Sequence, residues 1–127
     1  MIGADTSFLI DFFNGDEEAI TLMDKHKDVL YLCENVVYEF LCGNLTRDER
    51  KTFLGFVNQF PVFGFDRESS LAAAELHRKS RKEGRQVPHP DGMIAGTYIA
   101  HGIGELITGN PGQFREIKDL EVITYRE

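Results

Sequence analysis

The chain has 127 residues, of which 42% are hydrophobic and 28% charged, a composition typical of one globular domain that needs no disulfide or metal staples. Its 14 basic and 21 acidic residues leave a formal net charge of −7, so the domain as a whole repels nucleic acid. Any contact with nucleic acid must therefore be local or assisted by metal.

The chain shows no sign of export or of a membrane span. No segment reaches the roughly 20 apolar residues of a membrane helix, and the first residues lack the basic region of a signal peptide. Cys33 and Cys42 form no CxxC pair and suit reduced thiols. We expect a soluble, cytoplasmic protein with no membrane partner.

Short apolar runs alternate with helical patterns from end to end, which predicts an α/β fold with a parallel sheet. The expected strands lie near residues 2–5, 29–32, 62–65, 105–108 and 122–124.

Three helices are indicated by their boundaries. Thr46 and Glu49 form the pattern of a capping box, and apolar residues then recur at helical spacing until Phe60-Pro61. An Ala-rich run predicts the longest helix over 66–83, stopped by Gly84. A further helix is expected to begin at Pro90 and to run to about residue 101.

Asp5 ends the first expected strand and precedes an apolar helix. Ligands of open α/β sheets bind at the carboxyl ends of the strands, so Asp5 is a candidate functional acid. The alternative is that Asp5 only caps the helix that follows.

Glu39 interrupts an apolar sequence in what we expect to be a largely buried helix. An unpartnered buried carboxylate is costly, and Gly43, one turn later, leaves room beside it. The alternative is an acid that reaches solvent from the rim of an amphipathic face.

Asp91 and Asn110 complete the set of candidate site residues. Asp91 lies in the first turn of its helix, where the helix dipole favours the ionised form, although helix starts often carry Asp without further function. Asn110 follows the fourth expected strand, yet Asn between Gly and Pro is also an ordinary turn residue.

Together these four residues can converge at one edge of a parallel sheet, where three carboxylates carry a formal charge of −3. Such an oxygen-rich set favours Mg²⁺ or Mn²⁺ over zinc. The four histidines show no metal-binding spacing, and we interpret them as surface or packing residues, with His89 the one candidate for ligand contact.

The ordered motifs resemble the PIN-domain ribonucleases, especially the VapC-type toxins of toxin–antitoxin pairs, over nearly the whole chain. The matching motifs are Asp5-Thr6-Ser7 before an apolar helix, Glu39 with Gly43 as E-x-x-x-G, Gly84-Arg85-Gln86-Val87-Pro88 leading to Asp91, Thr108-x-Asn110 with Phe114, and a terminal strand at Leu120-Glu121-Val122-Ile123.

This resemblance implies a single PIN-like domain over 1–127, with three α/β/α layers around a short, mostly parallel five-stranded sheet. It also implies an endoribonuclease dependent on Mg²⁺ or Mn²⁺, with Asp5, Glu39 and Asp91 as metal ligands and Asn110 where many members carry a fourth Asp. An antitoxin partner, a homodimer and an RNA substrate are implied as well. A housekeeping PIN nuclease and a non-catalytic PIN scaffold that binds RNA or protein are the alternatives.

In the resulting scheme Asp5 and Asp91 ligate the principal metal, Glu39 ligates it or holds a water, and Asn110 orients ligands by hydrogen bonds. Thr6, Ser7 and Thr108 are candidates to support these ligands. Receiver domains and haloacid-dehalogenase-type phosphatases fit less well, because neither a second acid beside Asp5 nor a DxDxT motif is present.

Five basic residues gather within 78–85, and we expect Arg81, Lys82 and Arg85 to contact RNA. The alternative is a solvated helix end. The helix that bears Phe53, Phe56 and Phe60 could bind a partner, although this spacing also suits core packing.

Overall fold

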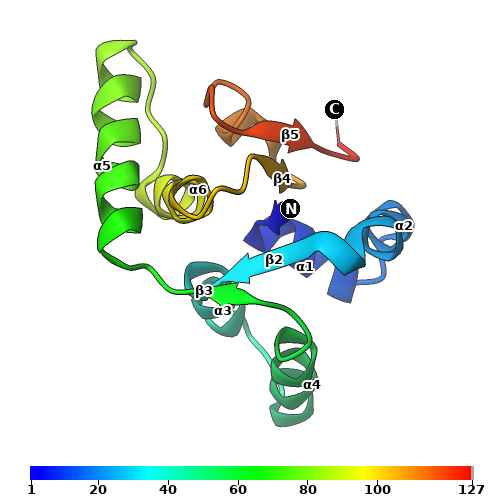
Figure 1. Ribbon diagram of the computed structural model, residues 1–127. Helices are drawn as coiled ribbons and strands as arrows, with labels where there is room; N and C mark the ends of the chain where they lie inside the picture. The colour runs from blue at the N-terminus through cyan, green and yellow to red at the C-terminus, as the bar shows by residue number, and fades with distance from the viewer. Residues whose placement is uncertain (127) are drawn as a thin grey trace.

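The computed structural model describes residues 1–126 and shows one sheet of five strands in the order β3-β2-β1-β4-β5 (Figure 1). Residue 127, the last of the predicted domain, lies outside the described residues. The strands are β1 Ile2–Ala4, β2 Leu30–Cys33, β3 Val62–Phe63, β4 Glu105–Ile107 and β5 Glu121–Ile123. Every pairing between them is parallel, so the sheet is parallel throughout rather than mostly so.

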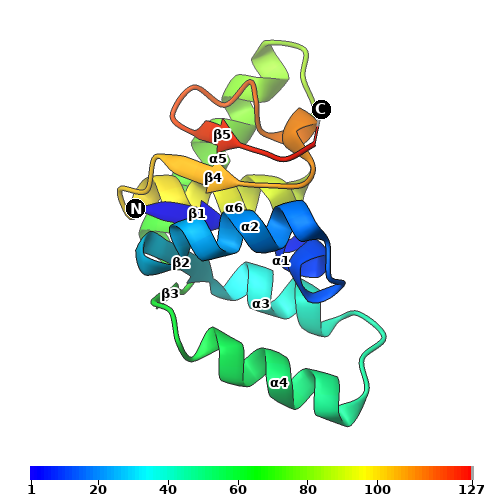
Figure 2. The same cartoon turned by 90° about the vertical axis from the view of Figure 1, so that its right-hand side faces the viewer.

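Helices cover both faces of the sheet, which confirms the predicted three-layer α/β arrangement. The helices are α1 Thr6–Phe13, α2 Glu17–His26, α3 Glu34–Leu41, α4 Arg47–Val57, α5 Arg67–Lys82 and α6 His89–Ala100, with short 3-10 turns at Lys27–Val29 and Pro111–Gln113. Helices α1 to α4 lie on one side, and α5 and α6 on the other (Figure 2). Among residues 1–126, no helix has both the length and the apolarity to span a bilayer.

The chain changes direction between β1 and β4, which are neighbours in the sheet. It first runs outward from β1 to β2 and β3, and then returns through α5 and α6 to the other side of β1. Ala4 is in register with Ile107, so the residues that follow, Asp5 and Thr108, leave the sheet side by side. Such a switch point is where open α/β sheets bind ligands.

Side-chain caps explain where several helices begin. Asp5 and Asp66 each accept a hydrogen bond from the backbone N–H three residues later. Both hydrogen bonds of the predicted capping box are present, because the Glu49 N–H donates to the Thr46 hydroxyl and the Thr46 N–H donates to the Glu49 carboxylate. The same logic explains α2, to which the sequence analysis assigned no element. Asp16 caps it, a signal that could have revealed this helix.

Helix α6 lies against the sheet and is buried along most of its length. The Tyr98 ring covers Gly3, where a Cβ would meet ring carbons at 2.6 Å, and the Tyr98 hydroxyl donates to the Ala4 carbonyl at 2.6 Å. Gly96 allows α6 to approach α5 closely, because a Cβ at this position would meet the Ala73 backbone nitrogen at 2.6 Å. These contacts hold the second half of α6 against β1 and α5.

Three helices differ from the sequence-based expectation. Helix α3 is not largely buried, because Tyr38 is 70% exposed and only one side of this helix faces the core. Helix α4 ends at Val57 rather than at Phe60, and the intervening residues form a turn. Pro90 is the second rather than the first residue of α6.

The aromatic residues of α4 pack inward, as the core interpretation expected. Phe53 is buried and stacks on Phe40, and Phe56 packs edge-on against Phe13. Phe60 contacts Phe56 from the following turn. The two cysteines are free thiols, Cys33 buried and Cys42 exposed.

Candidate functional site

Asp5 lies at the centre of the sheet edge and is only 4% exposed. Its Oδ1 accepts the Phe8 N–H at 3.0 Å, so it caps α1 as the alternative interpretation proposed. Its carboxylate also accepts hydrogen bonds from the Ser7 hydroxyl at 2.8 Å and the Thr108 hydroxyl at 2.5 Å. Burial nevertheless raises the pKa of Asp5 to about 6, against the effect of these hydrogen bonds. Asp5 is therefore more than a cap.

The two hydroxyls that bind Asp5 are themselves oriented by backbone groups. The Gly109 N–H donates to Ser7 Oγ at 2.9 Å, and the Asn110 N–H donates to Thr108 Oγ1 at 2.9 Å. Each hydroxyl thus accepts one hydrogen bond from a backbone N–H and donates one to the Asp5 carboxylate. The loop after β4 therefore fixes the orientation of the Asp5 carboxylate.

Glu39 extends from α3 toward the same edge and is half-buried. The Thr6 hydroxyl donates to Glu39 Oε1 at 2.6 Å across a sequence separation of 33 residues. Glu39 is accordingly tied to the residue next to Asp5, rather than free on the rim of its helix. Thr6, Ser7 and Thr108 each donate a hydrogen bond to an acid of the candidate site.

Asp91 lies in the first turn of α6 and is half-buried. Pro88, not Asp91, is the capping residue, and no hydrogen bond to the Asp91 carboxylate occurs among residues 1–126. Burial first, and the charge of Glu39 second, raise the pKa of Asp91. Burial and the charge of Glu39 therefore outweigh the α6 dipole, which by itself would favour the ionised form of Asp91.

The three acids face one another without a balancing cation. The charge of Asp91 adds to the raised pKa of Asp5, as the charge of Glu39 does for Asp91. None of the ion pairs formed within residues 1–126 involves any of the three. Unpaired carboxylates that repel one another are a donor set suited to a hard divalent cation.

The arrangement limits how such a cation could be held. No three His, Cys, Asp or Glu side chains within 1–126 are close enough to form a metal cluster as they lie. Mg²⁺ commonly uses one or two carboxylates and keeps several waters, so the set fits an ion held directly by part of the cluster. Ligation by all three acids would require side chains to move.

Asn110 lies at the same edge but is exposed, and only its backbone N–H enters the hydrogen bonds described above. Its neighbour Gly109, which the sequence analysis did not single out, contributes a backbone N–H to Ser7. The sequence signal for this role is a Gly between two candidate site residues.

The histidines lie outside this cluster, in surface or packing positions. The His89 ring is exposed and stacks on His77 with 4.7 Å between ring centroids. His101 stacks on Phe63 and contacts Asp66 at 3.1 Å.

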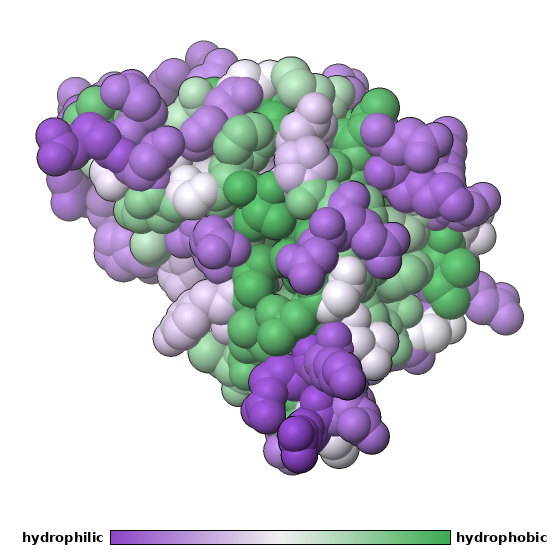
Figure 3. Space-filling model, turned by 60° about the horizontal axis from the view of Figure 1, so that its bottom comes forward, coloured by the Kyte–Doolittle hydropathy of each residue, from purple (hydrophilic) through white to green (hydrophobic). Residues whose placement is uncertain are grey.

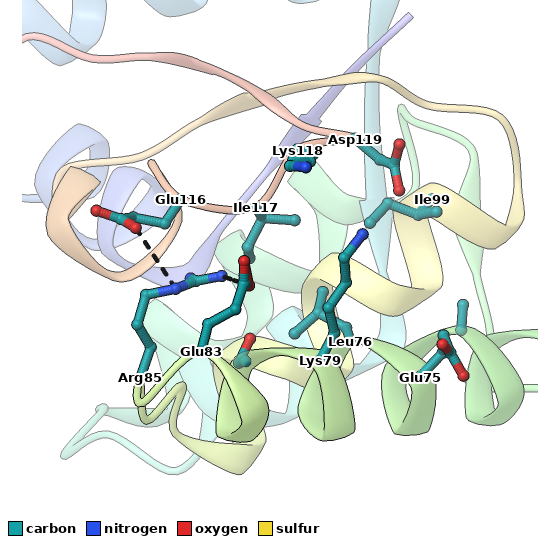
Figure 4. A pocket seen from close by; sticks show the side chains of 12 residues that line it. Glu75, Leu76, Lys79, Glu83, Arg85, Ile99, Glu116, Ile117, Lys118 and Asp119 are labelled. Atoms are coloured by element: carbon teal, nitrogen blue, oxygen red, sulfur yellow. Dashed lines mark hydrogen bonds and ion pairs between the residues drawn. The ribbon is translucent and has the colours of Figure 1, made fainter.

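The basic end of α5 has two kinds of cation. Arg81 and Lys82 are exposed, whereas Arg85 contacts Glu83 at 2.6 Å and Glu116 at 3.4 Å. Figure 4 shows Arg85 held between these two carboxylates, beside a cavity of about 180 Å³ between α5 and residues 116–119. The cavity contains none of the candidate acids.

An apolar groove of about 420 Å³ adjoins Glu39 between α1, α3 and α4. Its lining includes the apolar side chains of Ile10, Phe13, Phe40 and Leu45. Figure 3 views the molecule from the side on which α4 lies and shows hydrophobic residues gathered in a band across this face. The groove places an apolar surface directly beside the acidic site.

Comparison with known proteins decides the family. The PIN domain model matches residues 3–120. The chain belongs to the PIN domain family. Ribonuclease VapC3 of Methanocaldococcus jannaschii is 28% identical over 95 residues, which cover 74% of this chain and 94% of that protein.

Solved structures share the fold of this PIN domain at low sequence identity. The Rickettsia felis VapBC2 complex bound to a promoter DNA fragment matches with a TM-score of 0.85 and 18% identity, over 98% of this chain and 99% of that chain. A toxin–antitoxin complex from Klebsiella pneumoniae matches with a TM-score of 0.84 and 22% identity over all of both chains. The sequence-based assignment to the family and to its fold is thereby confirmed.

Proposed function

We propose that this chain is an endoribonuclease that uses Mg²⁺ or Mn²⁺ to hydrolyse RNA phosphodiester bonds. The observation that carries the proposal is that three separate segments bring Asp5, Glu39 and Asp91 to one edge of the sheet. There Asp91 acts on the pKa of Asp5 and Glu39 acts on that of Asp91, and no ion pair within residues 1–126 involves them. Membership of the PIN family and the similarity to a protein named as a ribonuclease support it.

In this proposal Asp5 and Asp91 hold the ion, and Glu39 ligates it or orients a water. A divalent ion supplies charge neutralisation at the phosphate and lowers the pKa of a nucleophilic water. Hydrolysis joins the water oxygen to phosphorus and breaks the bond to the leaving oxygen, which takes up a proton. Ser7 and Thr108 keep Asp5 oriented throughout.

Asn110 orients ligands by hydrogen bonds rather than by charge. Its amide adds no negative charge to the site, so the site binds one ion more tightly than a second. Substrate approaches through the exposed cations Arg81 and Lys82, at the end of α5 that leads into α6 and Asp91.

We further propose that the protein is the toxin of a type II toxin–antitoxin pair. The solved structures with the same fold include complexes described as toxin–antitoxin and VapBC complexes. The apolar groove next to Glu39 suits an apolar antitoxin segment, and a basic antitoxin side chain would neutralise the acids beside it. A homodimer and a cytoplasmic location, where RNA is available, belong to the same proposal.

Cleavage by the purified protein tests the nuclease. Single-stranded RNA should be cleaved with Mg²⁺ or Mn²⁺, cleavage should stop with chelator, and it should return when metal is restored. Asp91→Asn should lower the rate at least about 100-fold, because it removes a ligand charge while keeping the shape. The matched control Asp28→Asn, an exposed acid outside the cluster, should cleave normally.

Metal-independent cleavage, or a fully active Asp91→Asn protein, would refute this mechanism. RNA or protein binding without cleavage would favour the non-catalytic scaffold instead.

Co-expression with the product of the neighbouring gene tests the toxin assignment. A small partner that co-purifies and suppresses cleavage supports it, and Leu45→Glu in the groove should release that partner while leaving cleavage intact. Cleavage that persists with the partner bound would argue against occlusion of the site. A nuclease with no such neighbour would fit the housekeeping alternative.

A further inference from the structure

The segment that follows β5 is bonded to the loop that follows β4. The Thr108 N–H donates to the Ile123 carbonyl at 3.1 Å, and the Thr124 hydroxyl donates to the Thr108 carbonyl at 2.7 Å. Both backbone polar groups of Thr108 are therefore occupied by one neighbouring segment. The residue that binds Asp5 through its hydroxyl is held in place by its backbone as well.

Tyr125, the next residue, connects this segment to α1. Its hydroxyl donates to Asp11 Oδ2 at 2.6 Å, and its ring packs on Phe8 with 5.9 Å between centroids. The guanidinium of Arg126 also reaches Asp11, at 3.2 Å, and Asp16, at 2.7 Å. The pKa of Tyr125 is strongly raised by burial and by Asp11, so its hydroxyl keeps the proton it donates.

The bonded pair of Tyr125 and Asp11 lies directly on Gly109. A Cβ at Gly109 would meet the Tyr125 hydroxyl oxygen at 2.6 Å and Asp11 Oδ2 at 2.7 Å, so only glycine permits this approach. Gly109 is the residue whose N–H orients Ser7, and it stands between Thr108 and Asn110. The pair thus touches the middle of the loop that controls Asp5.

On the outer side of this loop, Gly109 is only partly buried and Asn110 is exposed. The contact of Gly109 with Tyr125 and Asp11 lies on that side, in addition to the hydrogen bonds already described. Loss of one such contact would let the loop move while the core beneath it stays intact.

We propose that Tyr125, anchored by Asp11, is a positioning residue that holds the loop Thr108–Asn110 in the geometry that orients Asp5. The inference rests on the proposed ribonuclease function for its effect on cleavage. Its effect on the loop itself is independent of that function. Neither Tyr125 nor Asp11 forms a hydrogen bond with Asp5 within residues 1–126; they act through Gly109, Ser7 and Thr108.

Four variants of the full chain separate this role from general stability. Tyr125→Phe removes the hydroxyl and keeps the ring, Asp11→Ala removes the acceptor, and Asp11→Asn keeps an acceptor oxygen. Tyr31→Phe is the matched control, because Tyr31 stacks on Phe63 at the other side of the sheet. Three measurements are made on each: kcat and KM on single-stranded RNA, Mn²⁺ affinity by calorimetry, and backbone amide NMR shifts of the metal-free protein.

Tyr125→Phe and Asp11→Ala should lower kcat about 10-fold with KM changed less than about twofold, weaken Mn²⁺ binding about threefold or more, and shift the Gly109 and Asn110 amides. The kcat of Asp11→Asn should lie within about threefold of the wild-type value, because the acceptor oxygen is kept. The kcat of the control Tyr31→Phe should equal the wild-type value.

Unchanged Gly109 and Asn110 amides in Tyr125→Phe would overturn the proposal, as would unchanged kcat and Mn²⁺ affinity. An Asp11→Asn protein as impaired as Asp11→Ala would also overturn it, because the acceptor would then not be the feature that matters. If the wild type cleaves no RNA, the proposed function fails, and the amide shifts and Mn²⁺ affinities still decide whether the pair positions the loop.

Discussion

Charge is concentrated in two regions of this PIN domain, and the two regions treat it differently. At the edge of β1 and β4, the acids Asp5 and Asp91 are buried or half-buried and take part in no ion pair within residues 1–126. At the end of α5, Arg85 is already paired with two carboxylates, and Arg81 and Lys82 face solvent. The acidic edge therefore keeps negative charge that no cation balances within residues 1–126. At the end of α5, by contrast, the positive charge is either paired with a carboxylate or exposed to water.

The difference shows why a charge cluster in sequence is not by itself a site. An exposed cation loses little by staying hydrated, and surface ion pairs contribute at most about 1 kcal/mol. A buried carboxylate without a cation costs stability, so a fold that keeps one retains it for another purpose or offsets it elsewhere. The acidic edge is consequently the region where substitution should have the largest effects.

The largest expected effect is that of Asp5→Asn. RNA cleavage should fall at least about 100-fold, yet the metal-free protein should melt at a higher temperature, because the substitution removes a repelling buried charge. Mn²⁺ should raise the melting temperature of the wild type by mass action and that of the variant much less. Asp66→Asn is the matched control, since Asp66 caps α5 as Asp5 caps α1 but lies outside the cluster. If Asp5→Asn and Asp66→Asn had the same effects on RNA cleavage and on melting temperature, Asp5 would be a helix cap only.

The second effect is a pH dependence of the metal-free protein. The folded pKa of Asp5 is about 6, above its ordinary value of 3.8, so the folded state binds more protons than the unfolded state between these values. The free energy of unfolding should therefore fall as pH rises from about 4 to about 6, by about 2 to 3 kcal/mol at 1.36 kcal/mol per pKa unit, and the cost persists above pH 6. Denaturant unfolding should show this loss in the wild type relative to Asp5→Asn. Parallel pH profiles for the two proteins would contradict it.

A smaller effect is expected at the basic end of α5. Replacing Arg81 and Lys82 together by Ala should weaken RNA binding about fivefold and flatten its salt dependence, because each lost phosphate contact removes about 0.7 from the slope for single strands. Lys25→Ala, which removes an exposed cation of α2, should leave the slope unchanged. A double variant with the wild-type slope would show that RNA does not contact this helix end.

The smallest effect is predicted for Glu116→Gln. This substitution removes one of the two carboxylates that pair with Arg85, so the guanidinium becomes more available to phosphate. RNA affinity measured at low salt should rise by no more than about twofold, in keeping with the small energy of a surface pair. Glu68→Gln, an exposed acid at the start of α5, serves as control. A large gain would mean that Arg85, rather than Arg81 and Lys82, dominates RNA contact.

Local sequence patterns were enough to predict most of the elements. All five predicted strands are present, with ends displaced by one or two residues, and the capping box at Thr46 and the stop at Gly84 are where the pattern indicated. Gly84 has a positive φ of 75°, which residues other than glycine rarely adopt. Helix α2 was missed although Asp16 caps it and Ala19 and Met23 form its buried side.

The sequence by itself determined which acids the chain carries and that Asp5 lies at the carboxyl end of a strand, because capping, turn chemistry and periodicity act between residues a few positions apart. Only the tertiary structure decided the rest of the site. Thr6 meets Glu39 across 33 residues, Thr108 meets Asp5 across 103, and Tyr125 meets Asp11 across 114. Arg85, which the sequence predicts to contact RNA, forms ion pairs with Glu83 and Glu116 that no local pattern indicated. The burial, the pKa and the ion pairs of these side chains depend on which distant segments pack together. Sequence periodicity does not indicate that packing.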